Sequence, residues 1–431
     1  MAVSARLVAV AAALVVVVAV VGTWSSLWVC CALLLLLVAV DLLLAPRPRD
    51  IGLSRREPFL STRLGEQAAV GVDVTNGGAR MLRGMLRDAW PPSAGATGER
   101  HALAVPPGER RALRTTLEPT RRGRRTSDRV TVRMFGPLRL AARQRSVVLP
   151  CAVDVLPPFR SKRYLPSRLA RLRDLEGRTA VLVRGQGTEF DSLREYVDGD
   201  DVRSIDWRAT ARAADVMVRT WRPERDRRVL IVVDSGRTSA GRVGDEPRLD
   251  AAMDAALLLG ALATRAGDRV DLMVWDRTVQ ASVQGETGAG LLTAMTRALA
   301  FVEASLVETD WRGLVTQVLH RERQRALVVL LTAVEQAPLS EGLLPVLPHL
   351  TSRHLVVVAG AADPEIATMA AGRGSAPAVY EAAAAARTEQ GRQRISEQLR
   401  RHGVEVVDAL PDVLAPAVAD RYLALKAAGR L

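Results

Sequence analysis

The first 44 residues of the chain are almost entirely apolar, and no other feature of the sequence constrains the fold as strongly. Two runs of 18 residues, from Leu7 to Trp24 and from Leu27 to Leu44, contain one charged residue, Asp41, in the last turn of the second run. As an α-helix each run would extend about 27 Å, at ~1.5 Å per residue. That length nearly spans the ~30 Å hydrocarbon core of a bilayer, so the sequence predicts two membrane-spanning helices.

The residues that flank the two runs predict how they cross the membrane. A short link around Trp24 fits a tight hairpin, Arg6 precedes the first run, and Arg47 and Arg49 follow the second. Because positively charged flanks stay on the cytoplasmic side, both ends of the hairpin should face the cytoplasm. The alternative, a cleaved signal peptide, would have a shorter apolar region and no second run directly behind it. We therefore expect residues 1–46 to form a multi-pass hairpin in the plasma (inner) membrane, with the C-terminal domains in the cytoplasm.

The composition of the chain excludes several classes of protein. The 431 residues include 3 Cys and 5 His, which are too few and too scattered for a disulfide framework or a zinc site. The formal net charge is +13, and residues 99–145 hold thirteen Arg against four acids. This basic segment could attract anionic lipid head groups, or it could be a solvated face beside the membrane. Only 4% of the residues are aromatic, too few for stacking on bases, so nucleic acid is not an expected partner.

Residues 56–155 carry the alternation of apolar and polar residues that is typical of β-strands. Residues 70–74 alternate and end at the turn signal Asn76-Gly77, and residues 130–134 alternate again. Several short strands within about a hundred residues are typical of two packed antiparallel sheets. The segment therefore predicts a small β-sandwich-like domain.

From Arg228 onward the pattern changes, because strand-like and helix-like segments alternate. The predicted strands cover residues 229–233, 270–275, 279–283, 326–331, 354–358 and 404–407. The predicted helices cover residues 249–266, 291–304, 311–321 and 376–401. Runs rich in Val and Leu without alternation suit strands that are covered on both faces. Residues 228–431 are therefore predicted to form an α/β domain with a doubly wound, mostly parallel sheet.

Polar residues follow the first strand of this domain, where such sheets bind their ligands. Asp234, Ser235 and Thr238 come directly after that strand, and Thr309 precedes a predicted helix. Carboxylate and hydroxyl oxygens are ligands that Mg²⁺ accepts, so these four residues are candidate metal ligands. The alternative is that Asp234 and the hydroxyl groups cap the turn and the following helix.

A dense mixture of charges lies in the connecting segment, residues 156–227. Its prominent members are Glu189, Arg194, Asp200, Arg203, Asp206, Trp207 and Arg212. These charges could pair internally and pin the segment onto the sheet, or they could present a charged groove to a partner. Paired carboxylates can perform acid–base chemistry, but no nucleophile, His or metal cluster accompanies them. We therefore do not expect an enzyme.

The motif that runs from Glu189-Phe190 through Asp206-Trp207 to Thr210-Ala211-Arg212 resembles the domain of unknown function 58 family. This family consists of bacterial membrane proteins that carry a von Willebrand factor A-like domain. The resemblance covers nearly the whole chain. It implies an α/β doubly wound von Willebrand factor A-like domain and a MoxR-type AAA+ ATPase as partner.

The chain departs from the metal-ion adhesion pattern that this resemblance implies. The pattern is Asp-x-Ser-x-Ser, with Thr-Asp after a later strand. In this chain Gly236 and Thr238 stand at the two serine positions, and Ala333 follows Thr332. Two oxygens are therefore missing, unless Asp310 beside Thr309 replaces one. The resemblance thus implies a degenerate site that binds Mg²⁺ weakly or not at all.

Three functions fit these observations. The first is a membrane-anchored cytoplasmic adaptor that binds proteins and works with a MoxR-type ATPase in assembly, maturation or envelope processes. The second is a divalent-metal-dependent hydrolase centred on Asp234. The third is a structural protein of the membrane surface, held to lipid by the two helices and by the basic β domain.

Overall fold

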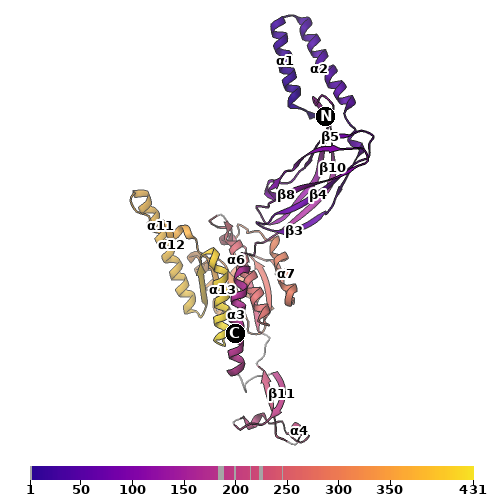
Figure 1. The fold of residues 1–431 in the computed structure, drawn as a ribbon. Coiled ribbons are helices and arrows are strands. Elements are labelled where there is room, and N and C mark those ends of the chain that lie inside the picture. The colour runs from indigo at the N-terminus through magenta and orange to yellow at the C-terminus, as the bar shows by residue number, and fades with distance from the viewer. Residues whose placement is uncertain (1, 183–188, 199, 214, 223–226, 245) are drawn as a thin grey trace. The chain divides into compact units, whose positions relative to one another are not determined.

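The protein is a mixed α/β chain with a β-rich N-terminal region (Figure 1). The computed structural model describes residues 2–182, 189–198, 200–213, 215–222, 227–244 and 246–431. The chain divides into two compact units, residues 1–156 and residues 157–431.

Two apolar helices begin the first unit, α1 (Ala5–Val21) and α2 (Trp24–Leu44). Gly22 ends α1 with a left-handed φ of 67°, a conformation that favours glycine. Thr23 then caps α2, because its side-chain oxygen accepts a hydrogen bond from the Ser26 amide. Among the described residues, one helix is long and apolar enough to cross a membrane, over Trp24–Asp50. The apolar α1 has 17 residues and is shorter than such a span.

Asp41 is not a solvent-exposed charge at the end of α2, because its side chain is fully buried. One carboxylate oxygen accepts a hydrogen bond from the Leu138 amide (2.8 Å), and the other accepts from the amides of Leu140 (2.7 Å) and Ala141 (2.9 Å). The hydroxyl of Ser4, the residue that caps α1, donates to the Arg139 carbonyl in the same turn (2.6 Å). One turn of the β-rich region therefore holds an end of both helices.

Two sheets make up the rest of the first unit. The larger sheet runs in the order β1 (Ala2–Val3), β10 (Ala141–Leu156), β9 (Gly123–Phe135), β5 (Leu82–Asp88), β7 (Arg100–Val105), and β3 (Phe59–Arg63) also pairs with β10. The smaller sheet runs in the order β2 (Ile51–Arg55), β4 (Ala68–Asn76), β8 (Arg110–Leu117), β6 (Ala96–Thr97). Val72 and Val74 of the smaller sheet share a buried core with Leu86, Leu103 and Val132 of the larger one. The two sheets therefore pack against each other through their apolar faces.

A six-stranded sheet forms the centre of the second unit. Its order is β17 (Val279–Val283), β16 (Arg269–Trp275), β13 (Arg228–Asp234), β18 (Leu327–Leu331), β19 (Leu355–Ala361), β20 (Glu405–Ala409). The edge strand β17 is antiparallel to β16, and the other neighbours pair in parallel. Each predicted strand overlaps one of these six. The sheet thus brings the carboxyl ends of five parallel strands to one edge.

Helices cover both faces of this sheet (Figure 1). On one face lie α6 (Arg248–Arg265), α7 (Gly288–Ala300) and α13 (Pro411–Ala427). On the other face lie α8 (Trp311–Arg321), α10 (Leu347–Thr351) and α12 (Ala376–Arg401). In β13 the residues Val229, Ile231 and Val233 belong to the first core, whereas Leu230 and Val232 belong to the second. This double burial explains why the strand contains no polar alternation.

The remaining elements of the second unit include several that the sequence analysis did not predict. The connecting segment contains a helix, α3 (Leu165–Leu182), and a hairpin of β11 (Glu189–Glu195) and β12 (Met217–Arg222). Helix α7 ends at Ala300, four residues before its predicted end. The unit also contains these short elements: η3 (Arg160–Tyr164), η4 (Val202–Ser204), α4 (Trp207–Thr210), α5 (Arg237–Ala240), β14 (Arg242–Val243), β15 (Glu246–Pro247), α9 (Gln336–Pro338), η5 (Leu339–Leu343) and α11 (Pro364–Ala370).

Candidate functional site

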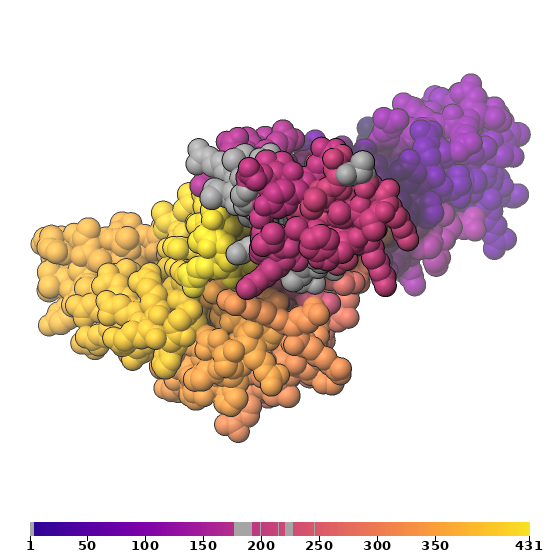
Figure 2. Space-filling model, turned by 90° about the horizontal axis from the view of Figure 1, so that it is seen from below, coloured from indigo at the N-terminus to yellow at the C-terminus, as the bar shows by residue number. Residues whose placement is uncertain are grey.

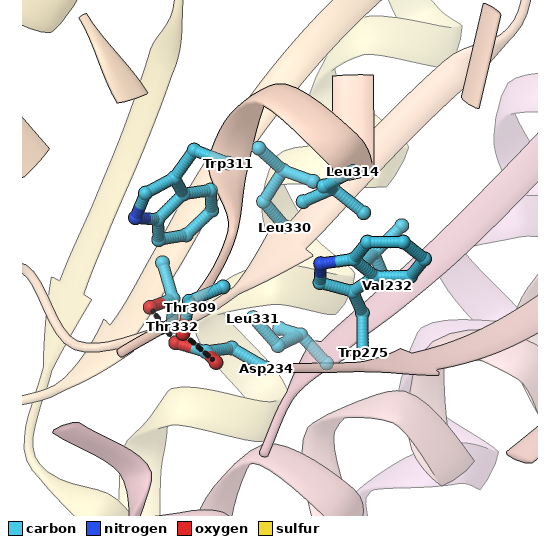
Figure 3. Close-up of a pocket in the computed structure, with 9 residues that line it drawn as sticks. All are labelled: Val232, Asp234, Trp275, Thr309, Trp311, Leu314, Leu330, Leu331 and Thr332. Atoms are coloured by element: carbon cyan, nitrogen blue, oxygen red, sulfur yellow. Dashed lines mark hydrogen bonds between the residues drawn. The ribbon is translucent and has the colours of Figure 1, made fainter. Parts of the chain in front are cut away.

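Asp234 is the last residue of the central strand β13 and lies at the carboxyl edge of the sheet. Its side chain is buried, with 3% of the residue exposed. Figure 3 shows its carboxylate pointing toward Thr309 and Thr332, which come from two different segments of the chain. The position agrees with the general rule that doubly wound sheets bind ligands at this edge.

Four donors converge on the two carboxylate oxygens of Asp234. The Gly236 amide (2.8 Å) and the Thr309 hydroxyl (2.7 Å) donate to Oδ1. The Thr332 hydroxyl (2.6 Å) and the Thr238 hydroxyl (3.3 Å) donate to Oδ2. Asp234 therefore joins the ends of β13 and β18 and the loop that precedes α8.

All four of these donors are electrically neutral. Burial raises the pKa of the Asp234 carboxyl, and the hydrogen bonds from the three threonines and Gly236 lower it without offsetting that rise. Within the described residues, Asp234 forms no ion pair. The site is thus a buried acid that is solvated by dipoles.

A narrow apolar pocket adjoins Asp234 (Figure 3). Its walls include the rings of Trp275 and Trp311 and the side chains of Leu314 and Leu330. The space between these walls leaves no room for a water-sized sphere. The pocket therefore isolates one side of the carboxylate from solvent.

The structure brings some of the candidate metal ligands together and separates another. Thr238 and Thr309 both reach Asp234, whereas the Ser235 hydroxyl donates to the Trp275 carbonyl at 3.3 Å. Oδ1 of Asp310 accepts a hydrogen bond from the Gly313 amide (2.9 Å) and caps α8.

Thr332 belongs to the site and was not predicted as a member. In the sequence, Thr332 is notable only because Ala333 follows it where an acid was expected. Its hydroxyl nevertheless makes the shortest hydrogen bond to Asp234, at 2.6 Å. A hydroxyl residue at the end of the neighbouring parallel strand was the available signal, since parallel strands end at the same edge.

The residues around Asp234 do not fit a bound Mg²⁺ ion. In the described part of the chain, no group of three His, Cys, Asp or Glu side chains could hold a metal ion. Mg²⁺ takes six oxygens in octahedral geometry and retains several waters. Here a single carboxylate stands among hydroxyl groups, and both of its oxygens already accept two hydrogen bonds each.

The charged motif of the connecting segment divides into an internally paired part and an exposed part. The Arg194 guanidinium contacts both oxygens of Asp200 (2.7 and 2.6 Å). Asp206 caps α4 and accepts a hydrogen bond from Arg219 (2.8 Å). Hydrogen bonds to the Ala209 amide and to Arg219 hold the pKa of Asp206 below its ordinary value. These contacts brace the β11–β12 hairpin from within.

The exposed part of the motif consists of Trp207, Arg203 and Arg212. Trp207 is 69% exposed, and neither Arg203 nor Arg212 forms an ion pair within the described segments. The surface of this hairpin region, in magenta and pink, faces the viewer in Figure 2. Glu189 is the first residue of β11, and its side chain lies outside the part that the structure describes.

Residues 192–407 match the family described as protein of unknown function DUF58. This chain is a member of the DUF58 family. The matched range includes most of the hairpin and continues through Asp234, Thr309 and Thr332. Both the braced motif and the strand-end site therefore belong to the DUF58 region of the chain.

Relatives of this DUF58 protein occur in mycobacteria. Uncharacterised proteins of Mycobacterium tuberculosis and Mycobacterium bovis are 29% identical to it over 161 residues, which is 37% of this chain and 50% of each relative. The chain thus spans about half the length of the curated relatives it matches.

Two solved structures are also similar to parts of the DUF58 protein. A PapD-like domain of human CEP192 has 11% identity and a TM-score of 0.20, with 26% of this chain and 89% of that domain covered. A CARDB domain from Pyrococcus furiosus has 12% identity and a TM-score of 0.18, with 25% and 94% covered.

Proposed function

We propose that this DUF58 protein is a membrane-anchored adaptor that binds other proteins in the cytoplasm and works with a MoxR-type AAA+ ATPase. Its α/β unit would be the binding module, and its two apolar helices would be the anchor. The protein would act in assembly, maturation or envelope processes. We propose a binding role without catalysis, because Asp234 is enclosed by neutral donors and is not open to a substrate.

The proposed anchor is the α1–α2 hairpin in the plasma membrane. Support comes from the apolar span that includes α2 and from the positive residues Arg6, Arg47 and Arg49 on its flanks. Asp41 joins the end of α2 to the β-rich region through three backbone amides, so the anchor would hold that region at a fixed distance from the bilayer. Both soluble units would then lie in the cytoplasm.

The proposed binding module is von Willebrand factor A-like. Support for this assignment comes from the parallel sheet with one antiparallel edge strand, from helices on both faces, and from Asp234 at the end of the central strand. The resemblance of the sequence motif points to the same domain. MoxR-type ATPases enter the proposal through that resemblance alone.

The binding role is supported chiefly by the exposed apolar side chains of the loop between α7 and α8. Leu306 is 80% exposed, and Phe301 at the start of the loop is half-exposed. The loop backbone is fixed, because the Ser305 amide donates to the Ser235 carbonyl and the Arg237 amide donates to the Val307 carbonyl, both at 2.8 Å. Exposed apolar side chains on a rigid backbone at the ligand edge are typical of a protein contact.

Affinity capture of the full chain, extracted from membranes and analysed by mass spectrometry, tests this function. We expect the wild type to capture a MoxR-type ATPase and the Leu306→Asp variant to lose it. Val148→Asp is the matched control, since Val148 is 69% exposed but lies in the β-rich region. Trp207→Ala tests the hairpin in the same experiment. Capture that survives both Leu306→Asp and Trp207→Ala would show that neither surface is the binding site.

A further inference from the structure

We infer that the Thr309 hydroxyl takes the place of the missing side chain of residue 236, and that this edge of the sheet closes without a divalent cation. Gly236 and Thr309 would then be a complementary pair, in which the absence of one side chain makes space for the other. This inference goes beyond the adaptor function and does not depend on the identity of any partner.

Gly236 is not needed for its backbone conformation. Its φ of −72° and ψ of −171° lie in the extended region that any residue adopts. A Cβ atom added at this position would lie 2.2 Å from the Thr309 hydroxyl oxygen and 3.1 Å from Asp234 Oδ1. The space that a serine would occupy is therefore already filled by the hydroxyl of another residue.

Thr309 cannot move aside easily, because backbone contacts hold the chain on both sides of it. On one side the Arg237 amide donates to the Val307 carbonyl (2.8 Å). On the other side the Asp310 amide donates to the Asp276 carbonyl (2.8 Å), and the Trp275 ring nitrogen donates to the Asp310 carbonyl (3.0 Å). A side chain at position 236 must therefore break the hydrogen bond between Thr309 and Asp234.

The filled space also explains how the site dispenses with a cation. A carboxylate has about four lone-pair positions, and Asp234 accepts four hydrogen bonds, two on each oxygen. A cation that bound the carboxylate oxygens directly would have to displace at least one of these donors. Thr309 thus occupies the space that a side chain at position 236 would need, and it supplies one of the four hydrogen bonds to the carboxylate.

A double-mutant cycle on the full chain in detergent tests the complementary pair. The variants are Gly236→Ser, Thr309→Ala and the combination, and the readout is hydrogen–deuterium exchange of the peptides that cover residues 234–240 and 305–312. We expect exchange to become roughly tenfold faster in each single variant, because each loses a hydrogen bond to a buried carboxylate. The combination should restore much of the protection, since a serine hydroxyl then occupies the vacated space.

The cycle has clear contrary outcomes. Protection that is unchanged in Gly236→Ser would show that the space is not filled. Losses in the double variant that equal the sum of both single variants would show that the two positions are independent. The rescue by the double variant also separates this idea from a general failure to fold, which a second substitution would not repair.

Cation independence is tested by titrating the full chain with Mn²⁺, read by electron paramagnetic resonance, and by thermal unfolding in Mg²⁺ or chelator. We expect the wild type and Asp234→Asn to bind the same amount of Mn²⁺, and the melting temperature of the wild type to be the same in both solutions. Mn²⁺ binding that disappears in Asp234→Asn would overturn the inference. Failure to capture an ATPase would leave it unaffected, since neither measurement involves a partner.

Discussion

Asp88 in the β-rich region and Asp234 in the α/β unit are both buried carboxylates with four side-chain or backbone donors, yet their charges are balanced differently. Asp88 accepts two hydrogen bonds from the Arg55 guanidinium, both at 2.7 Å, and further bonds from Trp90 (3.0 Å) and Ser127 (2.9 Å). Asp234 accepts all of its bonds from neutral hydroxyl and amide groups. One acid thus has a counter-ion and the other has dipoles alone.

The two environments shift the pKa in opposite directions. Burial would raise the pKa of Asp88, but the hydrogen bonds and charge of Arg55, with Trp90 and Ser127, outweigh it and lower the pKa. Burial raises the pKa of Asp234, where no counter-ion is present to reverse it. A buried acid with a raised pKa and no counter-ion, at the carboxyl edge of a parallel sheet, is a candidate for function. Asp88, by contrast, forms a complete ion pair with Arg55. The comparison therefore distinguishes an acid that is paired with a counter-ion from an acid that only neutral donors solvate.

The largest expected effect in this comparison comes from removing the counter-ion of Asp88. The side chains of Arg55 and Asp88 are 3% and 0% exposed, so Arg55→Ala leaves a buried charge without a partner. We expect the free energy of opening of the β-rich region to fall by about 3–5 kcal/mol, as for other broken buried pairs. Hydrogen exchange of the β5 amides in the purified full chain measures this change.

The matched control for that variant is Arg87→Ala, which removes the exposed pair of Arg87 with Glu99 at 3.0 Å. Exposed pairs contribute at most about 1 kcal/mol, so the control should change exchange only slightly. An equal effect of the two variants would show that Trp90 and Ser127 suffice to solvate Asp88. The distinction between a charge-paired and a dipole-solvated acid would then be lost.

A smaller effect is expected from the strongest of the dipoles around Asp234. Thr332→Val keeps the shape of the side chain but removes the 2.6 Å hydrogen bond to Oδ2. We expect a loss of about 1.5–3 kcal/mol, the usual range for a hydrogen bond to a charged group. Exchange of the β13 and β18 amides reports the loss. Thr316→Val, which removes a 2.9 Å bond from an exposed residue to a helix carbonyl, is the control.

A loss for Thr332→Val that does not exceed the loss for Thr316→Val would mean that the two hydroxyls contribute equally. The charge of Asp234 would then be solvated chiefly by Thr309 and the Gly236 amide at Oδ1. The loop before α8, which carries Thr309, would then contribute more to the site than the end of β18.

Much of the α/β unit could be predicted from the sequence, because buried parallel strands and covering helices have distinct periods. Asp234 was identified as a candidate by the rule for strand ends, which requires no knowledge of side-chain geometry, and Thr309 was identified by its place before a predicted helix. Thr332 was not predicted as a site residue, because the adhesion pattern expects an Asp after this threonine and Ala333 stands there instead. A pattern of metal ligands does not identify a residue such as Thr332, whose contact is a hydrogen bond to the carboxylate.

Other contacts left no local signal in the sequence. The partners of Asp41 lie 97 to 100 residues away, in a turn whose amide directions depend on the folded sheet. The β11–β12 hairpin carries few apolar residues, so its charged strands resemble a loop, and the Asp206–Arg219 contact joins residues from two elements. Long-range hydrogen bonds of this kind follow from the fold and cannot be read from residue spacing.

The smallest expected effect is the opposite pH dependence of the two acids. Asp88 has a lowered pKa, so its stabilising contribution is complete above the ordinary Asp pKa and is lost as the pH falls through its folded pKa. Asp234 has a raised pKa, so its relative stabilisation is complete below the ordinary Asp pKa and is lost as the pH rises through its folded pKa.

Melting temperatures of the full chain, compared with those of Asp88→Asn and Asp234→Asn from acid to neutral pH, measure both pH dependences. The melting temperature of Asp88→Asn should approach that of the wild type as the pH falls. The melting temperature of Asp234→Asn should instead increase relative to that of the wild type as the pH rises. If the difference for Asp234→Asn instead changes in the direction found for Asp88→Asn, a cation neutralises Asp234, and the contrast between the two acids disappears.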